Sequence, residues 1–391
     1  MRILHTSDWH LGRSLHREDL LGHQAAYVDH LLEVVETEGV DLVVVAGDVY
    51  DRALPPVDAV ALADDTFARL AASRAAVVIS SGNHDSARRL GFGSRVMDAA
   101  GLHLRTRPED VGRPVVLDDV HGPVVVHALP YLDPDAVREP WGLTTRSHEA
   151  ALTAAMTRVR TDLDARPGAR SVVLAHAFVA GGRASESERD IAVGGISIVP
   201  TSVFDGVDYV ALGHLHGPHT LAENVRYSGS PLAYSFSEAT QTKGSWLVDL
   251  AADGATSSTF VPAPVPRPLA RLRGDLDDLL DDPDLAVHEG SWVEATLTDA
   301  GRRPPQAMER LRRRFPHALV LTFDAPAAAG LRPRAPLPGR SAHDVALDFV
   351  ADVRGLAADE AEASLLASAC DACAEDPTQD PTRGPVAERT A

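Results

Sequence analysis

The feature that most constrains this chain is a repeated pattern in which an apolar, β-branched run ends abruptly in polar residues. Residues 41–46 lead into Asp48, and residues 76–79 lead into Asn83. Apolar runs of this length are typical of strands buried on both faces, and such strands occur in sheets that helices cover. The sequence therefore predicts a layered α/β fold.

The same pattern occurs at five places along the chain, and each place delivers acidic, amide or imidazole side chains. These side chains belong to Asp8, His10, Asp48, Asn83, His176, His214 and His216. Helical patterns over residues 24–38 and 56–72 separate the first runs. Because functional groups in open α/β sheets gather beyond the carboxyl ends of the strands, we expect these side chains to converge along one edge.

Carboxylates, imidazoles and one amide are a mixed set that suits two divalent ions a few ångströms apart. The neutral oxygen of Asn83 can bind an ion without adding charge that would repel a phosphate. Each residue also has a simpler interpretation: His176 as a buried core histidine, Asp48 as a turn residue, and Asp85 or Ser86 as a helix N-cap. The occurrence of all of them at successive strand ends favours the metal site.

Composition limits the kind of protein this is. The net charge of -19, from 37 basic and 56 acidic residues, is opposite to that of a protein that coats DNA by itself. A nuclease is not excluded, because bound cations make the electrostatic potential locally positive and a partner subunit can supply much of the DNA binding. No apolar run is long enough to span a bilayer, and no signal peptide is apparent, so we expect no membrane association.

The only cysteines are Cys370 and Cys373. Two cysteines exclude a disulfide framework and fit a reducing compartment, so we expect a cytoplasmic protein. A Cys-x-x-Cys pair can indicate metal or redox chemistry, but it lacks a second pair or a βαβ context here. The sequence therefore assigns no role to these cysteines.

A length of 391 residues predicts two domains or more, and shifts in composition place their boundaries. We expect a first domain over residues 1–265, a small α+β domain over 266–330, a helical segment over 340–375 and a disordered tail over 376–391. Stretches rich in proline at 262–268 and 325–339 are typical of linkers. All the polar strand ends fall in the first domain.

The small domain and the helical segment show their own patterns. Strand-like residues 291–297 and 318–323 flank a basic helix candidate over 305–315. Two helices are expected further along, over residues 341–353 and 357–369. The first of these has an apolar stripe without an obvious core of its own.

The polar strand ends form five motifs: Asp8-x-His10, Gly47-Asp48-x-x-Asp51-Arg52, Gly82-Asn83-His84-Asp85, His176, and Gly213-His214-x-His216. Together they resemble the signature of the calcineurin-like metallophosphoesterases. The chain is similar, more closely, to SbcD-type nuclease subunits, the bacterial counterparts of the meiotic-recombination nuclease. That similarity adds residues 5–13, 46–52 with Pro55 and Pro56, 227–231, and 235–238. It covers residues 1 to about 265, is less close over the small domain and is slight over the tail.

The resemblance implies a layered metallophosphoesterase β-sandwich flanked by helices, with a small α+β capping domain and a helical C-terminal tail. It also implies two ions that share the carboxylate of Asp48. The first would be held by Asp8, His10, Asp48 and His216, and the second by Asp48, Asn83, His176 and His214. Manganese is the usual ion of the family, with magnesium or another divalent ion as alternatives.

His84 and Asp51 have a different role in the resemblance. His84 would not be a ligand but would face the scissile phosphate, where it stabilises the transition state or protonates the leaving oxygen. Asp51 would orient His84. No Ser-His-Asp or Cys-His set is present, and this chemistry needs no covalent nucleophile.

A cluster of arginines in the small domain is the densest basic stretch of the chain, and it comprises Arg302, Arg303, Arg310, Arg312, Arg313 and Arg314. We expect Arg310, Arg312 and Arg313 to contact DNA, and the alternative is an ordinary solvated helix face. The helical segment resembles the region that docks on an SbcC-type ATPase, and the alternative is a helix packed back on the small domain. A homodimer within a heterotetramer is implied as well.

These expectations combine into a metal-dependent DNA nuclease subunit that works with an ATPase in replication, repair and recombination. It would act as a 3′–5′ exonuclease on duplex ends and as an endonuclease on hairpins or single strands. The alternative is a calcineurin-like phosphodiesterase or phosphatase acting on a nucleotide or a phosphoprotein, because the same ligand set serves all of them. A non-catalytic scaffold is disfavoured, since no ligand position has been lost.

Overall fold

The computed structural model describes residues 1–189, 191, 198–299, 303–324 and 340–375. The expected linker over residues 325–339, the expected tail over 376–391 and Arg302 lie outside the described residues. The chain divides into two compact units. One contains Met1–Leu272, Pro283–Ala295 and Arg312–Leu321, and the other contains Arg273–Asp282, Thr296–Leu311 and Thr322–Ala391.

Two six-stranded sheets form the centre of the first unit. The first sheet contains, in spatial order, β14 (Thr256–Pro262), β13 (Gly244–Leu250), β1 (Arg2–Thr6), β4 (Leu42–Ala46), β5 (Ala76–Ser80) and β6 (Leu102–Arg105). The second contains β11 (His219–Ala222), β12 (Val225–Tyr227), β10 (Tyr209–Gly213), β9 (Arg170–His176), β8 (Gly122–Ala128) and β7 (Val115–Asp119). Strands β1, β4, β5 and β6 run parallel, as do β8, β9, β10 and β12.

The two sheets pack face to face through their inner side chains. Ile3, Val44 and Val78 of the first sheet belong to one buried cluster with Leu174 and Ala211 of the second. These strands carry apolar residues on both faces because their outer faces are covered as well. The continuous apolar runs of the sequence therefore reflect burial from two sides.

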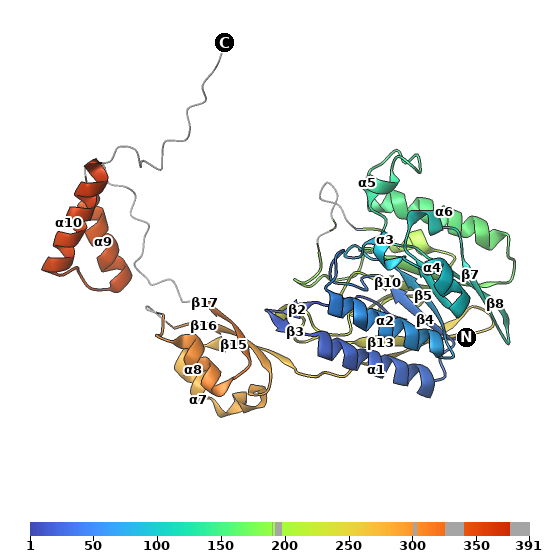
Figure 1. The fold of residues 1–391 in the computed structure, drawn as a ribbon, viewed down its shortest axis with the longest axis horizontal. Coiled ribbons are helices and arrows are strands. Elements are labelled where there is room, and N and C mark those ends of the chain that lie inside the picture. The colour runs from blue at the N-terminus through green and yellow to red at the C-terminus, as the bar shows by residue number, and fades with distance from the viewer. Residues whose placement is uncertain (190, 192–197, 300–302, 325–339, 376–391) are drawn as a thin grey trace, which may run out of the picture. The chain divides into compact units, whose positions relative to one another are not determined.

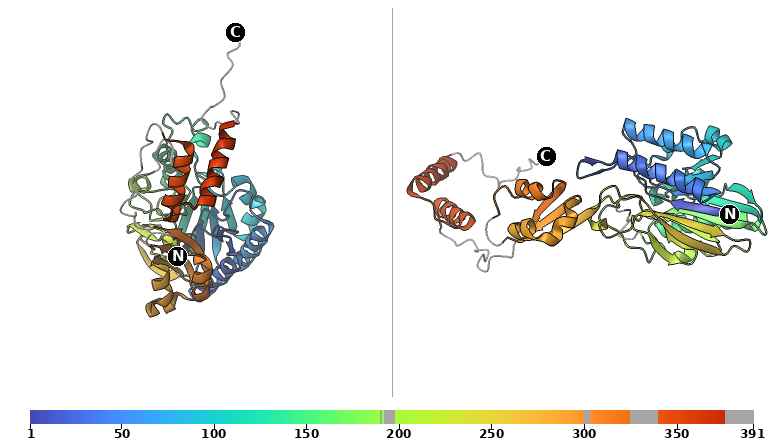
Figure 2. Two further views of the ribbon diagram at one scale, coloured as in Figure 1. Left: turned by 90° about the vertical axis from the view of Figure 1, so that its left-hand side faces the viewer. Right: turned by 90° about the horizontal axis from the view of Figure 1, so that it is seen from below.

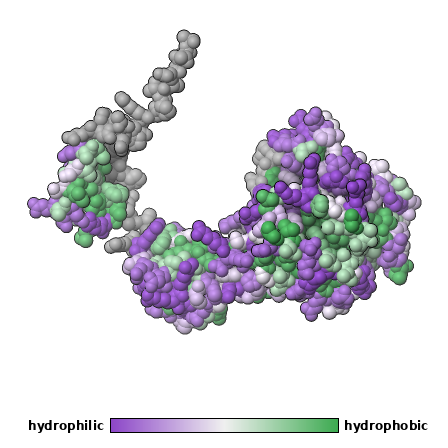
Figure 3. Space-filling view, viewed as in Figure 1, coloured by the Kyte–Doolittle hydropathy of each residue, from purple (hydrophilic) through white to green (hydrophobic). Residues whose placement is uncertain are grey.

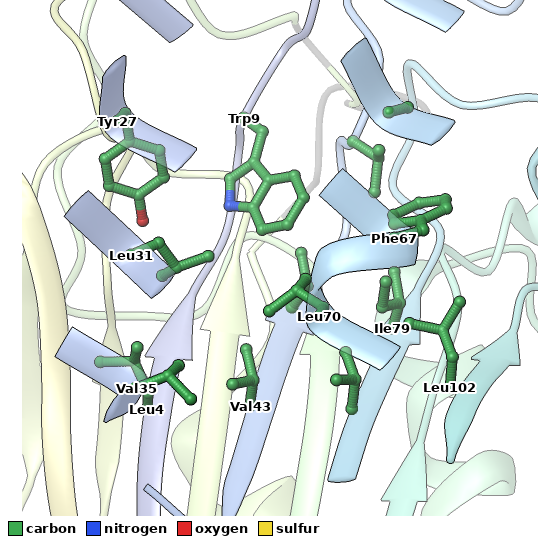
Figure 4. Packing of buried hydrophobic residues seen from close by; sticks show 14 of the residues in the cluster. Leu4, Trp9, Tyr27, Leu31, Val35, Val43, Phe67, Leu70, Ile79 and Leu102 are labelled. Atoms are coloured by element: carbon green, nitrogen blue, oxygen red, sulfur yellow. The ribbon is translucent and has the colours of Figure 1, made fainter. Parts of the chain in front are cut away.

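Helices cover the outer face of each sheet (Figures 1 and 2). Helices α1 (Leu21–Thr37) and α2 (Val57–Ala72) cover the first sheet, and their side chains pack on β1, β4 and β5 (Figure 4). Leu31 and Leu70 lie in this cluster beside Val43. Helix α6 (His148–Asp164) packs on the second sheet and begins at Ser147, whose side chain accepts a hydrogen bond from Ala150 N. The predicted β-sandwich flanked by helices is confirmed.

Short elements complete the first unit. They are β2 (Ser14–Leu15), β3 (Glu18–Asp19), α3 (Ala87–Leu90), α4 (Ser94–Met97) and α5 (Pro134–Val137). A three-stranded sheet follows in the chain, with the order β15 (Leu269–Gly274), β16 (Trp292–Leu297) and β17 (Ala318–Phe323). Helices α7 (Leu276–Asp281) and α8 (Ala307–Arg314) accompany it. The segment expected to be a small α+β domain thus contains both kinds of element.

The helical C-terminal segment consists of α9 (Ala342–Arg354) and α10 (Glu360–Glu375), which pack against each other. Helix α9 begins with a capping box between Ser341 and Asp344, and it ends at Gly355, which has a φ of 72°. His343 Nε2 lies 3.0 Å from Ala363 O, across the pair. Among the described helices, none combines the length and the apolar character that crossing a membrane would require.

Candidate metal centre

The carboxyl ends of five strands meet at one place in the first unit. Asp8 follows β1, Asp48 follows β4 and Asn83 follows β5, all from the first sheet. His176 is the last residue of β9, and His214 directly follows β10 in the second sheet. The side chains that the sequence predicted to converge therefore come from both sheets.

One group of possible ligand atoms belongs to Asp8, His10 and His216, and these atoms lie within 4.8 Å of one another. The Nε2 atoms of His10 and His216 are 3.0 Å apart. The carboxylate of Asp48 lies beside them, with Oδ2 3.7 Å from His10 Nε2. All four side chains are buried. They are the residues predicted to hold the first ion.

A second group contains Asp8, Asp48 and His176. His176 Nε2 lies 2.9 Å from Asn83 Oδ1 and 3.4 Å from Asp48 Oδ2, and His214 Nδ1 lies 3.2 Å from the same Asn83 oxygen. Asp48 thus contacts residues of both groups, and Asp8 belongs to both groups, so the bridging role of Asp48 stays a prediction. The assignment of individual ligands to individual ions stays a prediction.

The chemistry of this cluster fits divalent ions. Two buried carboxylates close together are costly unless a cation or protons compensate them. Burial raises the pKa of Asp8 to about 6, while for Asp48 the same burial is outweighed by the nearby imidazoles, led by His176, which hold its pKa well below the usual range. Among the described residues, His10 Nδ1 and Asn83 Nδ2 are buried without a hydrogen-bond partner.

The backbone at this edge adopts a conformation that side chains rarely permit. Asp8, His10 and Asp48 have φ angles of 54°, 45° and 51°, and His214 has a φ of 105°. Positive φ is uncommon outside glycine, although Asp, Asn and His adopt it more readily than other residues. Unfavourable backbone conformations of this kind gather at functional sites and persist because the surrounding structure holds them.

Glycines next to the ligands allow the two sheets to approach each other. A Cβ atom at Gly47 would lie 2.4 Å from His176 Nδ1, and one at Gly213 would lie 1.8 Å from Ala46 O. His176 Nδ1 itself lies 2.9 Å from Ala46 O, which fixes the orientation of the ring. The Gly-Asp and Gly-His motifs therefore supply space as well as ligands.

Asp85 holds two of the ligand-bearing loops together. Its carboxylate accepts hydrogen bonds from the backbone N–H groups of Val49 (3.1 Å), Tyr50 (2.9 Å) and Gly82 (2.9 Å). Burial, and then the charge of Asp48, raises the pKa of Asp85 to about 7. The sequence indicated Asp85 only as a possible helix cap, whereas its contacts link the loop after β4 to the loop after β5.

His84 lies beside this cluster. Its backbone N–H donates to Asp48 Oδ1 at 2.8 Å, and its Nδ1 lies 2.6 Å from the carbonyl oxygen of Asp51. The contact with Asp51 thus runs through the backbone, whereas the Asp51 carboxylate lies 3.8 Å from His10 Nδ1 and 3.7 Å from Arg13. Since possible ligand atoms of His84, His10 and Asp48 also lie within 4.8 Å of one another, the catalytic roles of His84 and Asp51 stay predictions.

Several arginines of the basic cluster form ion pairs or hydrogen bonds within the protein. Arg310 forms an ion pair with Asp277, and Arg312 Nε donates to Ala318 O at 3.0 Å. Arg314 Nε lies 3.2 Å from Glu289. Arg312 and Arg313 have exposed side chains on α8. Contact of Arg310, Arg312 and Arg313 with DNA stays a prediction.

Comparison with known families decides the class of the chain. Residues 1–218, more than half of the sequence, match the calcineurin-like phosphoesterase model. This chain belongs to the calcineurin-like phosphoesterase family. Residues 265–353 of this phosphoesterase match a second model, the type 5 capsule protein repressor C-terminal domain, which is the C-terminal domain of SbcD-type proteins. The two together are consistent with an SbcD-type nuclease subunit.

Solved structures add little to this assignment. A protein of Thermus thermophilus, TT1561, shares 13% identity with a TM-score of 0.39, over 66% of this chain and 98% of its own. A β-glucosidase from Exiguobacterium marinum shares 6% identity with a TM-score of 0.24, over 83% of this chain and 89% of its own. Both TM-scores lie under 0.5, so neither likeness bears on function. The family and the ligand clusters together make this chain a divalent-metal-dependent phosphoesterase.

Proposed function

We propose that this phosphoesterase is the nuclease subunit of a DNA end-processing complex. It would act in the cytoplasm as a 3′–5′ exonuclease on duplex ends and as an endonuclease on hairpins and single strands, during replication, repair and recombination. The observation that carries this proposal is the presence in one chain of the phosphoesterase edge and the SbcD-type C-terminal domain. The first supports phosphodiester chemistry, and the second favours a nuclease subunit over other phosphoesterases.

The predicted ligands at the edge of the sheets would hold two ions. Asp8, His10, Asp48 and His216 would hold one ion, and Asp48, Asn83, His176 and His214 would hold the other. Two divalent ions, of manganese or alternatively magnesium, supply Lewis-acid chemistry toward a phosphodiester when bound. The buried setting keeps bulk water away from the carboxylates and imidazoles, which strengthens their electrostatic interactions.

We propose that His84 moves a proton in the reaction. Its Nδ1 faces the Asp51 carbonyl oxygen, an acceptor only, so that the hydrogen of the neutral ring lies on Nδ1 and Nε2 is left available. Burial lowers the pKa of His84, which keeps the ring neutral when no phosphate lies nearby. A ring in this state can take up a proton or, once protonated, give it to a leaving oxygen.

The helical pair α9–α10 is the proposed docking element for an SbcC-type ATPase. Val345, Phe349 and Val353 lie on one helix and are 56%, 65% and 67% exposed. Figure 3 shows hydrophobic surface on this pair. Exposed apolar side chains at helical spacing are typical of a helix that binds in a groove of a partner. We also propose that two copies of the chain and two of the ATPase form the assembly.

The net charge of -19 favours a second candidate, a phosphodiesterase for small esters, because such an enzyme needs no basic surface for DNA. A manganese-dependent assay separates the two. Hairpin DNA and bis(p-nitrophenyl) phosphate are offered to the full chain with and without the ATPase, and with excess chelator as the control. Cleavage of the DNA, increased by the ATPase and ATP, supports the nuclease. Cleavage of the small ester but not of the DNA, both with and without the ATPase, would overturn the proposal.

A further inference from the structure

A buried carboxylate lies behind the ring of His216. The Nε2 of this ring faces His10 in the metal centre, while Nδ1 lies 3.2 Å from Glu238 Oε1 and 2.6 Å from Ser187 Oγ. The Ser187 hydroxyl also donates a hydrogen bond to Glu238. Since an ionised carboxylate only accepts hydrogen bonds, the Nδ1 of His216 carries the hydrogen, and Nε2 keeps its lone pair for an ion.

Lys243 compensates the charge of Glu238. The Glu238 side chain is fully buried and Lys243 is 5% exposed, and the distance from Nζ to Oε2 is 2.5 Å. Lys243 Nζ also donates to the carbonyl oxygen of His216 at 2.8 Å. Glu188 accepts the backbone N–H of His216, again at 2.8 Å. The ring and the backbone of this ligand are therefore both held from the side opposite to the ions.

The other imidazoles of the centre have weaker support among the described residues. His176 Nδ1 faces the neutral carbonyl of Ala46, whereas His10 Nδ1 has no hydrogen-bond partner in the described part of the chain and lies 3.8 Å from the Asp51 carboxylate. The Nδ1 of His214 faces the Asn83 oxygen, which is itself a predicted ligand, and so it points into the cluster. A carboxylate that accepts a hydrogen bond from an imidazole makes that imidazole a stronger ligand than a neutral acceptor does. Among these four imidazoles, His216 thus has the strongest support, and it belongs to the first of the two predicted ion positions.

We propose that Glu238 is a positioning residue, held by Lys243 and Ser187, that makes the ion position of His216 the tighter of the two. We refer to these three residues as the His216 brace. The proposal rests on the proposed function for the existence of two ion positions, but it does not depend on DNA as the substrate. It predicts that the ions bind in sequence, first at the position that includes His216.

Manganese titration of the full-length, metal-free protein without DNA tests the brace. Calorimetry and electron paramagnetic resonance give the Kd of each ion. The wild type should bind two ions with distinct Kd values. Glu238→Gln keeps the size of the side chain but not its charge, and it should raise the Kd of the tighter position by about 10–100-fold. The Kd of the second position should change by less than about threefold.

Asp162→Asn is the matched control. His127 Nε2 lies 3.2 Å from Asp162, so this pair repeats the histidine–carboxylate contact on β8 and α6, outside the ligand set. Both Kd values should be unchanged in this variant. The control therefore separates the loss of a carboxylate beside a ligand from the loss of any buried histidine partner.

Equal Kd values in Glu238→Gln and the wild type would overturn the brace. An equal rise of both Kd values together with a lower Tm would overturn it too, because it would show a general structural role. If Glu238→Gln does not fold, Ser187→Ala tests the same contact. It should raise the Kd of the tighter position by about threefold to tenfold. An unchanged Kd at that position in Ser187→Ala would contradict the proposal. A protein that binds both ions as described but leaves DNA uncut would overturn the proposed function alone.

Discussion

The edge of the two sheets and the helical pair α9–α10 differ in how far the chain itself completes them. At the edge, six of the seven predicted ligand side chains are almost fully buried and Asn83 is half-buried. Three of the predicted ligands share left-handed φ angles near 50°, and glycines fit against the rings. In α9, none of the described side chains is fully buried, and Val345, Phe349 and Val353 face solvent. The ligand cluster is thus assembled within this chain, whereas the helical pair leaves apolar side chains exposed, as at many interaction surfaces.

The edge should be the more sensitive region, and His84 its most sensitive residue outside the predicted ligands. His84→Ser should lower the rate of DNA cleavage by about 10²–10⁴ because it removes the imidazole that we propose transfers a proton, while both ions stay bound. Single-turnover cleavage and metal content are measured on the same sample. The exposed His121, changed to Ser, provides the control and should leave both unchanged. Loss of ions from His84→Ser would instead place this residue among the ligands.

The next largest effect is expected on stability. Lys243→Met leaves the Glu238 carboxylate buried without its cation, and breaking a buried pair in this way costs about 3–5 kcal/mol. Urea unfolding gives the free energy. Adding Glu238→Gln removes the stranded charge, so the double variant should recover part of the stability while its tighter manganese site stays weak. A single variant as stable as the wild type would show that the pair is not coupled as its distance implies.

A smaller effect is expected at the glycine behind His176. Gly47→Ala places a methyl group against the imidazole and forces a φ of 84° on alanine, so we expect a loss of about 1–3 kcal/mol and weaker manganese binding. Gly101→Ala is the matched control, because Gly101 has a φ of 78° with open space around its Cβ position. The control isolates the cost of the backbone. Manganese binding that is equally impaired in both variants would contradict the role of close packing at the edge.

Changes in the helical pair should leave the isolated chain almost unaffected. Phe349→Ser removes an exposed side chain, so the free energy of unfolding should move by no more than about 0.5 kcal/mol. Binding to the ATPase should weaken by about 2 kcal/mol if Phe349 fills a pocket of the partner. Val120 is 93% exposed in the first unit, and Val120→Ser should change neither quantity. Strong destabilisation by Phe349→Ser would mean that the helix packs within its own chain.

The smallest effect is expected on α8. Arg312→Glu with Arg313→Glu should weaken DNA binding modestly and lower the slope of log K against log salt by about one for each phosphate that the variant no longer neutralises. Binding is measured at several salt concentrations by fluorescence anisotropy. Arg107→Glu with Arg113→Glu, at two exposed arginines outside α8, changes the net charge by the same amount and is the control. The same slope in all three proteins would leave α8 as an ordinary solvated face.

The sequence predicts the layered fold well because burial on both faces leaves a strong local pattern. Apolar runs such as those of β4 and β5 are unmistakable, and their polar ends identify the metal edge. Helices α1 and α2 were predicted because their apolar residues repeat at helical spacing. Helix α6 was not predicted, although its buried Leu152, Met156 and Val159 repeat at helical spacing and were a usable signal.

Contacts between distant parts of the chain could not be predicted. The division of the parallel strands between two sheets depends on pairing partners far apart, such as β1 with β13. The contact of His216 with Glu238 depends on how the chain folds back after β12. The motif over residues 235–238 contains Glu238, but the sequence does not indicate which atoms this side chain contacts. Asp51 illustrates the same limit, because its carbonyl oxygen rather than its carboxylate contacts His84. One unusual signal was present in the sequence: Lys243 is the only lysine of the chain.

That single lysine has a practical consequence. Because Lys243 is buried, amine-directed cross-linkers and lysine-modifying enzymes find no side-chain amine on the surface of the folded protein. Mapping of an assembly with such reagents would return no links from this subunit's side chains even where the subunits touch. The thiols of Cys370 and Cys373, on α10, offer an alternative handle, and maleimide labels there would report directly on the helical pair. Conversely, amine labelling of Lys243 would be a sensitive gauge of local unfolding around the ions.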